Sequence, residues 1–297
     1  MRHREHREHR DDCVFLEPAA GDQIPLSPAR WTRSRIGLCS VLSVISVSGF
    51  ALNAHAAEPP RAIPLSELRS GITFAGANVQ ALQADDFGNP GMLWVERGEK
   101  RWSAAPADGK SCRDCHGDAA TSMKGVAARY PQADAKSGRV LTLEARINAC
   151  RTQRQQQSAL EYESDDLLGL TAYVATQSRG MPLKVAIEGR AWEAFDRARA
   201  LYYRRIGQFN LSCAQCHEAG YGRRIYAENV SQGHPTGYPG YRLEWQAFGS
   251  IERRLRACYS GVRAEMPEHG STELAELQLY LAWRGQGLPI EAPAVRR

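Results

Sequence analysis

The chain has 297 residues, of which 43% are hydrophobic and 24% are charged, and its formal net charge is +5 at pH 7. This composition is ordinary for a globular protein and suits about two domains once the N-terminus is removed. The first 57 residues hold seven Arg and six acidic residues, so the rest of the chain carries a net charge of about +4. So small a positive charge excludes nucleic acid as an implied partner.

The N-terminus has the features of an export signal. Residues 1–35 are polar and end in the basic stretch "RWTRSR", and the stretch Ile36–Leu52 is then apolar and uncharged. Ala54 and Ala56 follow as a small-x-small cleavage pattern. A basic flank, a short apolar run and small residues at the cleavage site are typical of a secretory signal peptide. We expect cleavage near Ala56 or Ala57, a mature chain in the periplasm, and no membrane association after cleavage.

A membrane anchor is the alternative for the apolar run Ile36–Leu52. The shortness of the run and the cleavage pattern directly after it favour cleavage. The long leader before it is either an extended n-region or the product of a start codon upstream of the true one. No later stretch is long and apolar enough to span a bilayer.

Two copies of the pattern C-x-x-C-H follow, "CRDCH" at Cys112–His116 and "CAQCH" at Cys213–His217. This pattern is the attachment signature of haem c, in which both thiols bond the haem vinyl groups and the histidine binds the iron. It predicts two covalently bound haem c groups with His116 and His217 as iron ligands. The cysteines that attach them are Cys112, Cys115, Cys213 and Cys216. A zinc knuckle or a redox dithiol is the alternative for one C-x-x-C, but two copies without histidines at zinc spacing favour haem.

An internal repeat relates the two motifs. One constant shift along the chain lays "TLEARINAC" (142–150) on "SIERRLRAC" (250–258) and Tyr130-Pro131 on Tyr238-Pro239, and the haem motifs repeat at a slightly shorter shift. The chain is therefore predicted to hold two tandem copies of one haem-binding unit. We expect a mainly α fold with a leader at 1–57, a first cytochrome c-like unit at 58–186 and a second unit, with the active site, at 187–297.

Helical signals lie at matching places in both units. Thr142 and Ser250 stand where an N-cap belongs, with aliphatic residues one and five positions later and a cysteine at the eighth. Residues 190–206 and 271–283 have the apolar periodicity of amphipathic helices. A linker is expected at residues 183–189, and strand signals are sparse.

The repeat also indicates the second axial ligand of each iron. Removal of the leader leaves six cysteines, two of which, Cys150 and Cys258, lie outside the haem motifs. A disulfide between them is the alternative in an exported protein. The rival ligand Met266 falls on Ser158 in the other unit, and His234 and His269 fall on Val126 and Glu161. Because only the cysteines recur, we expect His116 with Cys150 at the first iron, and His217 with Cys258 at the second.

Arginines distinguish the two units. Arg146 and Arg254 lie four residues before their cysteines, a spacing that puts guanidinium and sulfur on one helix face. The second unit adds further arginines where the first has uncharged residues, although the first has Arg151 and Arg154 just past its cysteine. The contrast is one of degree, and an anion is expected to prefer the second haem. The added residues are Arg253, Arg256 and Arg263, against Ala145, Asn148 and Gln155. For Arg254 the alternatives to substrate binding are a contact with a haem propionate or a salt bridge.

These motifs resemble the SoxA family, the dihaem cytochrome subunits of the bacterial Sox sulfur-oxidation system. The resemblance extends from about Gly71 to the C-terminus and is most specific in "YYRRIGQFNLSCAQCHEAGYGRRIYAENVSQGHPTGYPGYRLEW", "GSIERRLRAC" and "LYLAWRGQGLPIEAPAVR". "NPGMLWVERGEKRW" and "SCRDCHG" match the first unit of the dihaem members. Met266 departs from the pattern expected of the family.

The resemblance implies an L-cysteine S-thiosulfotransferase that joins thiosulfate to a cysteine of the carrier SoxYZ while two electrons leave through the haems. It implies a heterodimer with the monohaem cytochrome SoxX. It also implies catalytic roles for Cys258, which family members can carry as a persulfide, and for Arg254. The alternatives are a dihaem thiosulfate dehydrogenase that forms tetrathionate and a pure electron-transfer cytochrome. A peroxidase-like dihaem enzyme is disfavoured because two axial ligands leave no open site.

Overall fold

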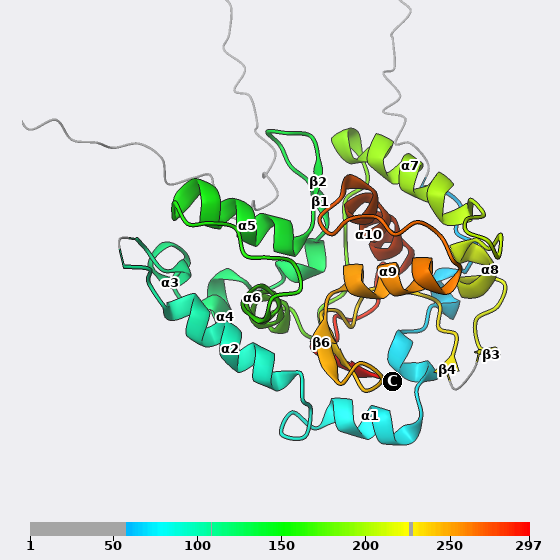
Figure 1. Cartoon of the computed structure of the whole chain (residues 1–297), viewed down its shortest axis with the longest axis horizontal. Coiled ribbons are helices and arrows are strands. Elements are labelled where there is room, and N and C mark those ends of the chain that lie inside the picture. Colours follow the sequence, from blue (N-terminus) through cyan, green and yellow to red (C-terminus); the bar gives the residue numbers. More distant parts are fainter. Residues whose placement is uncertain (1–57, 108, 226–227) are drawn as a thin grey trace, which may run out of the picture. The chain divides into compact units, whose positions relative to one another are not determined.

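The structure is a computed structural model that describes residues 58–297 apart from 108 and 226–227. The signal peptide predicted at 1–57 lies outside these residues. Helices supply most of the regular structure, which confirms a mainly α fold (Figure 1). The α-helices are α1 (Ala77–Ala84), α2 (Met92–Ser103), α3 (Cys112–His116), α4 (Ala119–Ser122), α5 (Leu143–Arg154), α6 (Asp165–Thr176), α7 (Trp192–Tyr203), α8 (Cys213–His217), α9 (Ile251–Gly261) and α10 (Thr272–Arg284).

The remaining elements are short, in keeping with the sparse strand signal. The 3₁₀ turns are η1 (Leu65–Glu67), η2 (Gly71–Phe74), η3 (Ala127–Arg129) and η4 (Gly189–Ala191). The strands are β1 (Gln132–Ala133), β2 (Val140–Leu141), β3 (Arg224–Ile225), β4 (Glu228–Asn229), β5 (Gly240–Arg242), β6 (Ala247–Gly249) and β7 (Ala294–Arg296). β5 lies between β6 and β7, antiparallel to the first and parallel to the second. None of the described helices is both long enough and apolar enough to cross a membrane.

One hairpin–helix arrangement occurs twice, at the same shift along the chain as the sequence repeat. In β1–β2, Gln132 faces Leu141, and in β5–β6 the equivalent residues Gly240 and Gly249 face each other. The ligand-bearing helices α5 and α9 begin directly after these hairpins (Figure 1). The repeat is therefore a repeat of backbone register as well as of residue type.

A hydroxyl group starts each of these two helices, as the sequence predicts. The Thr142 side chain accepts a hydrogen bond from the Ala145 N–H, and the Ser250 side chain accepts one from the Arg253 N–H. Each bond satisfies an N–H group that has no partner inside the helix, which contributes about 1 kcal/mol. The caps fix the first turn, and thereby the position of every later side chain on α5 and α9.

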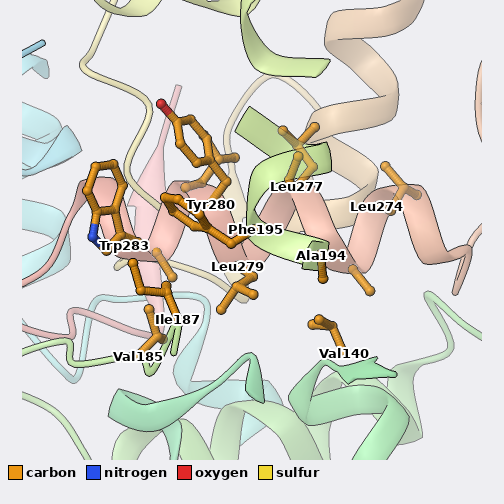
Figure 2. Close-up of a cluster of buried hydrophobic side chains, with 14 of the residues drawn as sticks. Val140, Val185, Ile187, Ala194, Phe195, Leu274, Leu277, Leu279, Tyr280 and Trp283 are labelled. Carbon is orange, nitrogen blue, oxygen red and sulfur yellow. The ribbon is translucent and has the colours of Figure 1, made fainter. Parts of the chain in front are cut away.

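The largest hydrophobic core forms where α7 packs on α10 (Figure 2). Phe195 of α7 meets the rings of Tyr280 and Trp283 at centroid distances of 5.4 and 5.0 Å. Phe195 is fully buried, and burial of a side chain of this size stabilises the fold by roughly 1.5–3 kcal/mol. Residues from the first unit and from the predicted linker, among them Val140 and Val185, belong to the same core.

A second close contact joins α2 and α6. A Cβ atom on Gly98 would lie 2.0 Å from the carbonyl oxygen of Gly169, so only glycine permits this approach. Next to it, Trp94 stacks on Phe248 of β6 at 4.9 Å, which links α2 to the second hairpin.

The segment from Arg61 to Phe74 belongs to the first unit by sequence but packs against the second. The Arg61 guanidinium lies 4.0 Å from the centroid of the Trp283 ring and donates to the Trp283 carbonyl at 2.6 Å. Gln232 accepts from the Arg69 N–H at 2.7 Å and donates to the Glu67 carbonyl at 3.0 Å. The segment thereby holds the loop that follows the second haem motif.

Two glutamates at equivalent repeat positions are buried, although a charged side chain in a first helical turn is usually exposed. Glu252 of α9 is 2% exposed and accepts hydrogen bonds from the Gly270 N–H at 2.8 Å and from Gln278 at 3.2 Å. Glu144 of α5 is 7% exposed and lines a cavity of about 70 Å³ together with Thr236 and Gln278. Burial raises the pKa of Glu144 from 4.5 to about 7, and the charges of Glu252 and Glu163 add to the rise.

We predict that Glu144→Gln removes a pH-dependent loss of stability. Because the folded chain binds this proton more tightly, the free energy of unfolding is unaffected below pH 4.5, falls between pH 4.5 and 7, and levels off above. A shift of this size corresponds to about 3 kcal/mol. Chemical denaturation of the holoprotein at pH 4.5 and pH 8 should show the variant to be more stable than wild type only at pH 8. The exposed Glu161→Gln is the control, and equal pH profiles for Glu144→Gln and wild type would contradict the prediction.

Candidate haem sites and active site

The candidate iron ligand His217 is held in place by its own short helix and by the loop that follows it. The Ser212 side chain accepts from the Gln215 N–H, and the Gln215 side chain accepts from the Ser212 N–H, so a capping box closes the start of α8. At the other end of the helix, His217 Nδ1 lies 2.8 Å from the carbonyl oxygen of Ser231. A carbonyl only accepts, so Nδ1 carries the proton and the lone pair stays on Nε2, as a metal-binding imidazole requires.

The surroundings of His217 keep the ring neutral and fixed. Burial lowers its pKa to about 4, so the ring is uncharged at physiological pH. Gly233 packs against it: a Cβ atom there would lie 2.9 Å from His217 Cγ, and the backbone φ of +77° itself favours glycine. The donor tautomer and the close glycine fit a haem-ligating histidine.

Cys258 lies close to the sulfurs of the second haem motif. Burial raises the pKa of Cys213 to about 12, and the charge of Cys258 adds to the rise. The pKa of Cys216 is raised by the same two causes. Cys258 is partly exposed and comes from α9, and its electrostatic interactions with Cys213 and Cys216 bring this candidate ligand near the two attachment cysteines of α8.

Arg254 faces Cys258 one turn away on α9. The electrostatic interaction with Cys258 is the largest cause of the raised pKa of Arg254, and burial opposes it. The Arg254 guanidinium makes no hydrogen bond or ion pair to any residue that the structure describes. A partly buried guanidinium that makes no ion pair is a candidate site for an anion.

The other three arginines expected at this site have protein partners. Arg253 lies over the Trp245 ring at 4.5 Å, and Arg263 lies over the Phe209 ring at 4.9 Å. Arg256 donates a hydrogen bond to the Pro267 carbonyl. These contacts leave all three positive charges in place, and Arg254 is the one of the four arginines without such a contact among the described residues.

The first haem motif has a similar local structure. Ser111 caps α3 in a capping box with Asp114. Burial lowers the pKa of His116, whose ring lies 5.7 Å from that of Trp102. Burial also raises the pKa of Cys112, partly offset by Gln155.

Helix α5, which carries Cys150, runs beside this motif. The Gln155 side chain at its C-terminal end donates to the Lys110 carbonyl at 2.8 Å and lies 3.9 Å from Cys112 Sγ. Burial raises the pKa of Tyr130, and nearby Cys150 contributes to the rise. The described contacts thus place α5 next to both the motif and Tyr130.

Arg146, the repeat counterpart of Arg254, is neutralised. Its Nη2 atom lies 3.0 Å from a carboxylate oxygen of Asp134, and its Nε donates to the Tyr130 hydroxyl at 3.2 Å. The two arginines that look alike in the sequence therefore differ in charge balance, and only Arg254 is available to an added anion.

The rival ligands take other positions. His269 lies 3.3 Å from a Glu252 oxygen and stacks on Tyr162. His234 is buried, with Nε2 at 3.1 Å from the Gln232 side-chain oxygen. Met266 is 46% exposed on the surface.

The disulfide and zinc alternatives can be compared with the same geometry. Cys150 and Cys258 form no disulfide, and the same holds for the other four cysteines at positions 58–297. Zinc needs three or four protein ligands, and no group of three or more His, Cys, Asp or Glu side chains able to hold a metal lies in the described part of the chain. A haem iron needs only two protein ligands, for which His217 and Cys258 are the candidates in the second unit.

Sequence reasoning missed several functional groups. The Ser231 carbonyl is a backbone atom and leaves no signal in residue type. Gly233 lies within a Gly- and Pro-rich loop, where its role is hidden among other glycines. Asp134 could have been found, because the shift that matches Arg146 to Arg254 places Asp134 on Arg242, a reversal of charge.

Known proteins resemble this chain in sequence and in fold. A family model described as SoxA/TsdA, cytochrome c domain, matches residues 97–183. The L-cysteine S-thiosulfotransferase subunit SoxA of Pseudaminobacter salicylatoxidans is 41% identical over 243 residues, which cover 81% of this chain and 85% of that protein. The subunit of the same name from Rhodovulum sulfidophilum is 42% identical over 77% of this chain and 80% of its own length. A chain in the crystal structure of SoxXA from P. pantotrophus is 37% identical, with a TM-score of 0.75 over 77% of this chain and 87% of that one. The chain belongs to the SoxA family.

Proposed function

We propose that this chain catalyses the oxidative transfer of thiosulfate onto a cysteine of a carrier protein, as an L-cysteine S-thiosulfotransferase whose active site is at the second haem unit. The observation that carries the proposal is the Arg254 guanidinium, which faces Cys258 and makes no ion pair or hydrogen bond with the described residues. The names of the relatives support the same activity.

The reaction is a two-electron oxidation, so it needs an electron acceptor. The carrier thiol loses its proton, its sulfur forms a new S–S bond with the outer sulfur of thiosulfate, and two electrons are released. Haem c, when bound, supplies the acceptor for these electrons. Thiosulfate is a dianion and the carrier thiolate is also negative, so a fixed cation is needed to offset their repulsion. Arg254 supplies that cation.

The other residues of the site have supporting roles. Cys213 and Cys216 would attach the second haem, with neutral His217 and Cys258 as its axial ligands. The Ser231 carbonyl holds the His217 tautomer, and Cys258, which would act as a persulfide or as a thiolate, lies at the reacting centre.

The first unit would carry an additional haem c, attached through Cys112 and Cys115, with His116 and Cys150 as axial ligands. Its task is electron transfer. We assign residues 58–186 and 187–297 to the two haem domains, and 1–57 to a leader removed on export to the periplasm. The proposed partners are a monohaem cytochrome like SoxX, in a heterodimer, and a carrier like SoxYZ.

The direct test is the mass of a carrier-type cysteine peptide after incubation with thiosulfate, an electron acceptor and this protein with its partner cytochrome. We expect a thiosulfonate adduct with the wild type and none with Cys258→Ala, while the first haem remains attached. Met266→Leu is the control and should leave both the adduct and the EPR signal of thiolate-ligated haem unchanged. Tetrathionate without adduct would instead indicate a thiosulfate dehydrogenase, and neither product would indicate an electron carrier.

Removal of the charge at position 254 should weaken thiosulfate use. Arg254→Gln deletes charge-assisted hydrogen bonds that contribute about 1.5–3 kcal/mol, so kcat/KM for thiosulfate should fall roughly 10- to 100-fold, chiefly through KM. Arg263→Gln, which removes a guanidinium already stacked on Phe209, should leave KM for thiosulfate unchanged. A similar loss in both variants would mean that overall charge, and not the position of Arg254, determines binding.

A methyl group at Gly233 should disturb the second haem alone. Gly233→Ala puts a Cβ atom 2.9 Å from His217 Cγ, so we expect the second haem to be lost or its histidine displaced, with the first haem retained. Gly222→Ala is a matched control, since its φ of +83° is equally strained for alanine but no atom lies within 4 Å of the added carbon. The haem content per chain and the absorption spectrum measure the effect, and equal haem content in both variants would refute it.

A further inference from the structure

We propose that Asp134 excludes the substrate anion from the first haem unit, and so determines which of the two related sites takes thiosulfate. The inference rests on the proposed function for the identity of the anion. Asp134 acts through Arg146 and is therefore a positioning residue.

The ion pair between Asp134 and Arg146 is shielded and well supported. The two side chains are 15% and 19% exposed, and their charged atoms are 3.0 Å apart. The Ser137 N–H and hydroxyl both donate to the second carboxylate oxygen of Asp134 at 2.8 Å. Burial alone would raise the pKa of Asp134, but the hydrogen bonds from Ser137 and the charge of Arg146 outweigh it and lower that pKa. The carboxylate therefore stays charged and in place.

The second unit lacks this carboxylate. The hairpin register that pairs Gln132 with Leu141 and Gly240 with Gly249 makes Arg242 the structural equivalent of Asp134. Arg242 is itself occupied, with its Nη2 atom 2.9 Å from Glu228 and 3.6 Å from Glu244.

Both glutamates raise the pKa of Arg254 less than Cys258 does, and neither forms an ion pair with it. Two positions of the repeat thus hold Arg146 and Asp134 in the first unit, and the equivalent positions hold Arg254 and Arg242 in the second.

This difference has a direct consequence for a dianion. At the first unit, thiosulfate would have to displace Asp134 from Arg146 and meet its negative charge at close range. At the second unit, no described carboxylate forms an ion pair with Arg254, because Glu228 and Glu244, which act on it from a distance, are paired with Arg242. Arg151, the other cation that acts on Cys112, donates to the Ser158 carbonyl at 3.2 Å. The first haem is left to electron transfer because its arginine is already neutralised.

The test uses Asp134→Asn, which keeps the size of the side chain and an oxygen acceptor for Ser137 but removes the charge. It is made in the holoprotein with its partner cytochrome, in an Arg254→Gln background that weakens the second site. Thiosulfate is titrated into the oxidised protein, and binding is followed by calorimetry and by the EPR signal of the first haem.

We expect the double variant with Asp134→Asn and Arg254→Gln to bind thiosulfate at the first unit at least about tenfold more tightly than Arg254→Gln alone. The EPR signal of the first haem should change on binding. Asp134→Glu, which retains the charge, should keep the site closed, and a further Arg146→Gln should abolish the gained binding. These two variants distinguish a specific role from a structural one. In the chain with Arg254 intact, Asp134→Asn should leave carrier transfer unchanged.

An Asp134→Asn protein that keeps both haems but gains no thiosulfate binding would overturn the inference, as would equal gain in Asp134→Glu. If the Asn variant loses the first haem, Asp134→Ser takes its place with the same expectation. Failure of the proposed function is separate: a wild type that makes no carrier adduct would refute the transferase, whether or not Asp134→Asn opens the first site.

Discussion

The junction between a two-stranded hairpin and a hydroxyl-capped helix is the constraint on which both sites depend. Hairpin pairing fixes where the strand ends, and the Thr142 or Ser250 hydroxyl fixes where the helix begins. The arginine and the cysteine then follow at set positions on one face. A slip of one residue would rotate them about 100° around the helix axis and take both away from the haem motif. The Ser250 hydroxyl also donates to Glu163, so the cap of α9 is tied to the segment that precedes α6 in the first unit.

The sequence predicted those parts of the fold and site whose signals are local. The two C-x-x-C-H motifs, the hydroxyl N-caps of α5 and α9, and the helices α7 and α10 all lie where the pattern indicated. Each of these features depends on residues that are close together in the chain. The position of Cys258 near Cys213 was also predictable, because an internal repeat gives each unit a second copy against which its candidate ligands can be compared.

Features set by contacts between distant segments could not be predicted in this way. The attachment of residues 61–74 to the second unit through Arg61 and Gln232 joins positions that lie far apart in the sequence. The burial of Glu144 and Glu252 also depends on contacts between distant segments. The amphipathic pattern predicts that a glutamate in the first helical turn faces solvent, and the packing of neighbouring segments buries it instead. One difference between the repeats is visible in the sequence but could not be interpreted from it. Arg242 stands where the first unit has Asp134, and only the hairpin register shows that the two residues are structurally equivalent.

Charge, more than shape, separates the two units. Both present a capped motif helix, a hairpin and a ligand-bearing helix of the same register, so duplication alone would give two equivalent sites. In the first unit the arginine and its carboxylate form a closed pair, and no net charge remains for a ligand. In the second unit, Glu228 and Glu244 form ion pairs with Arg242. The charges of Arg284 and Glu218 likewise offset each other in a buried ion pair. Arg254 is then the cation beside Cys258 that makes no ion pair with the described residues, and its charge also lowers the pKa of His217.

A reaction that brings a dianion and a thiolate together requires such an unpaired positive charge where the sulfurs meet, whereas a site that only passes electrons does not. The same scaffold can therefore present an unpaired cation beside one C-x-x-C-H motif and a neutralised one beside the other through the exchange of very few charged side chains.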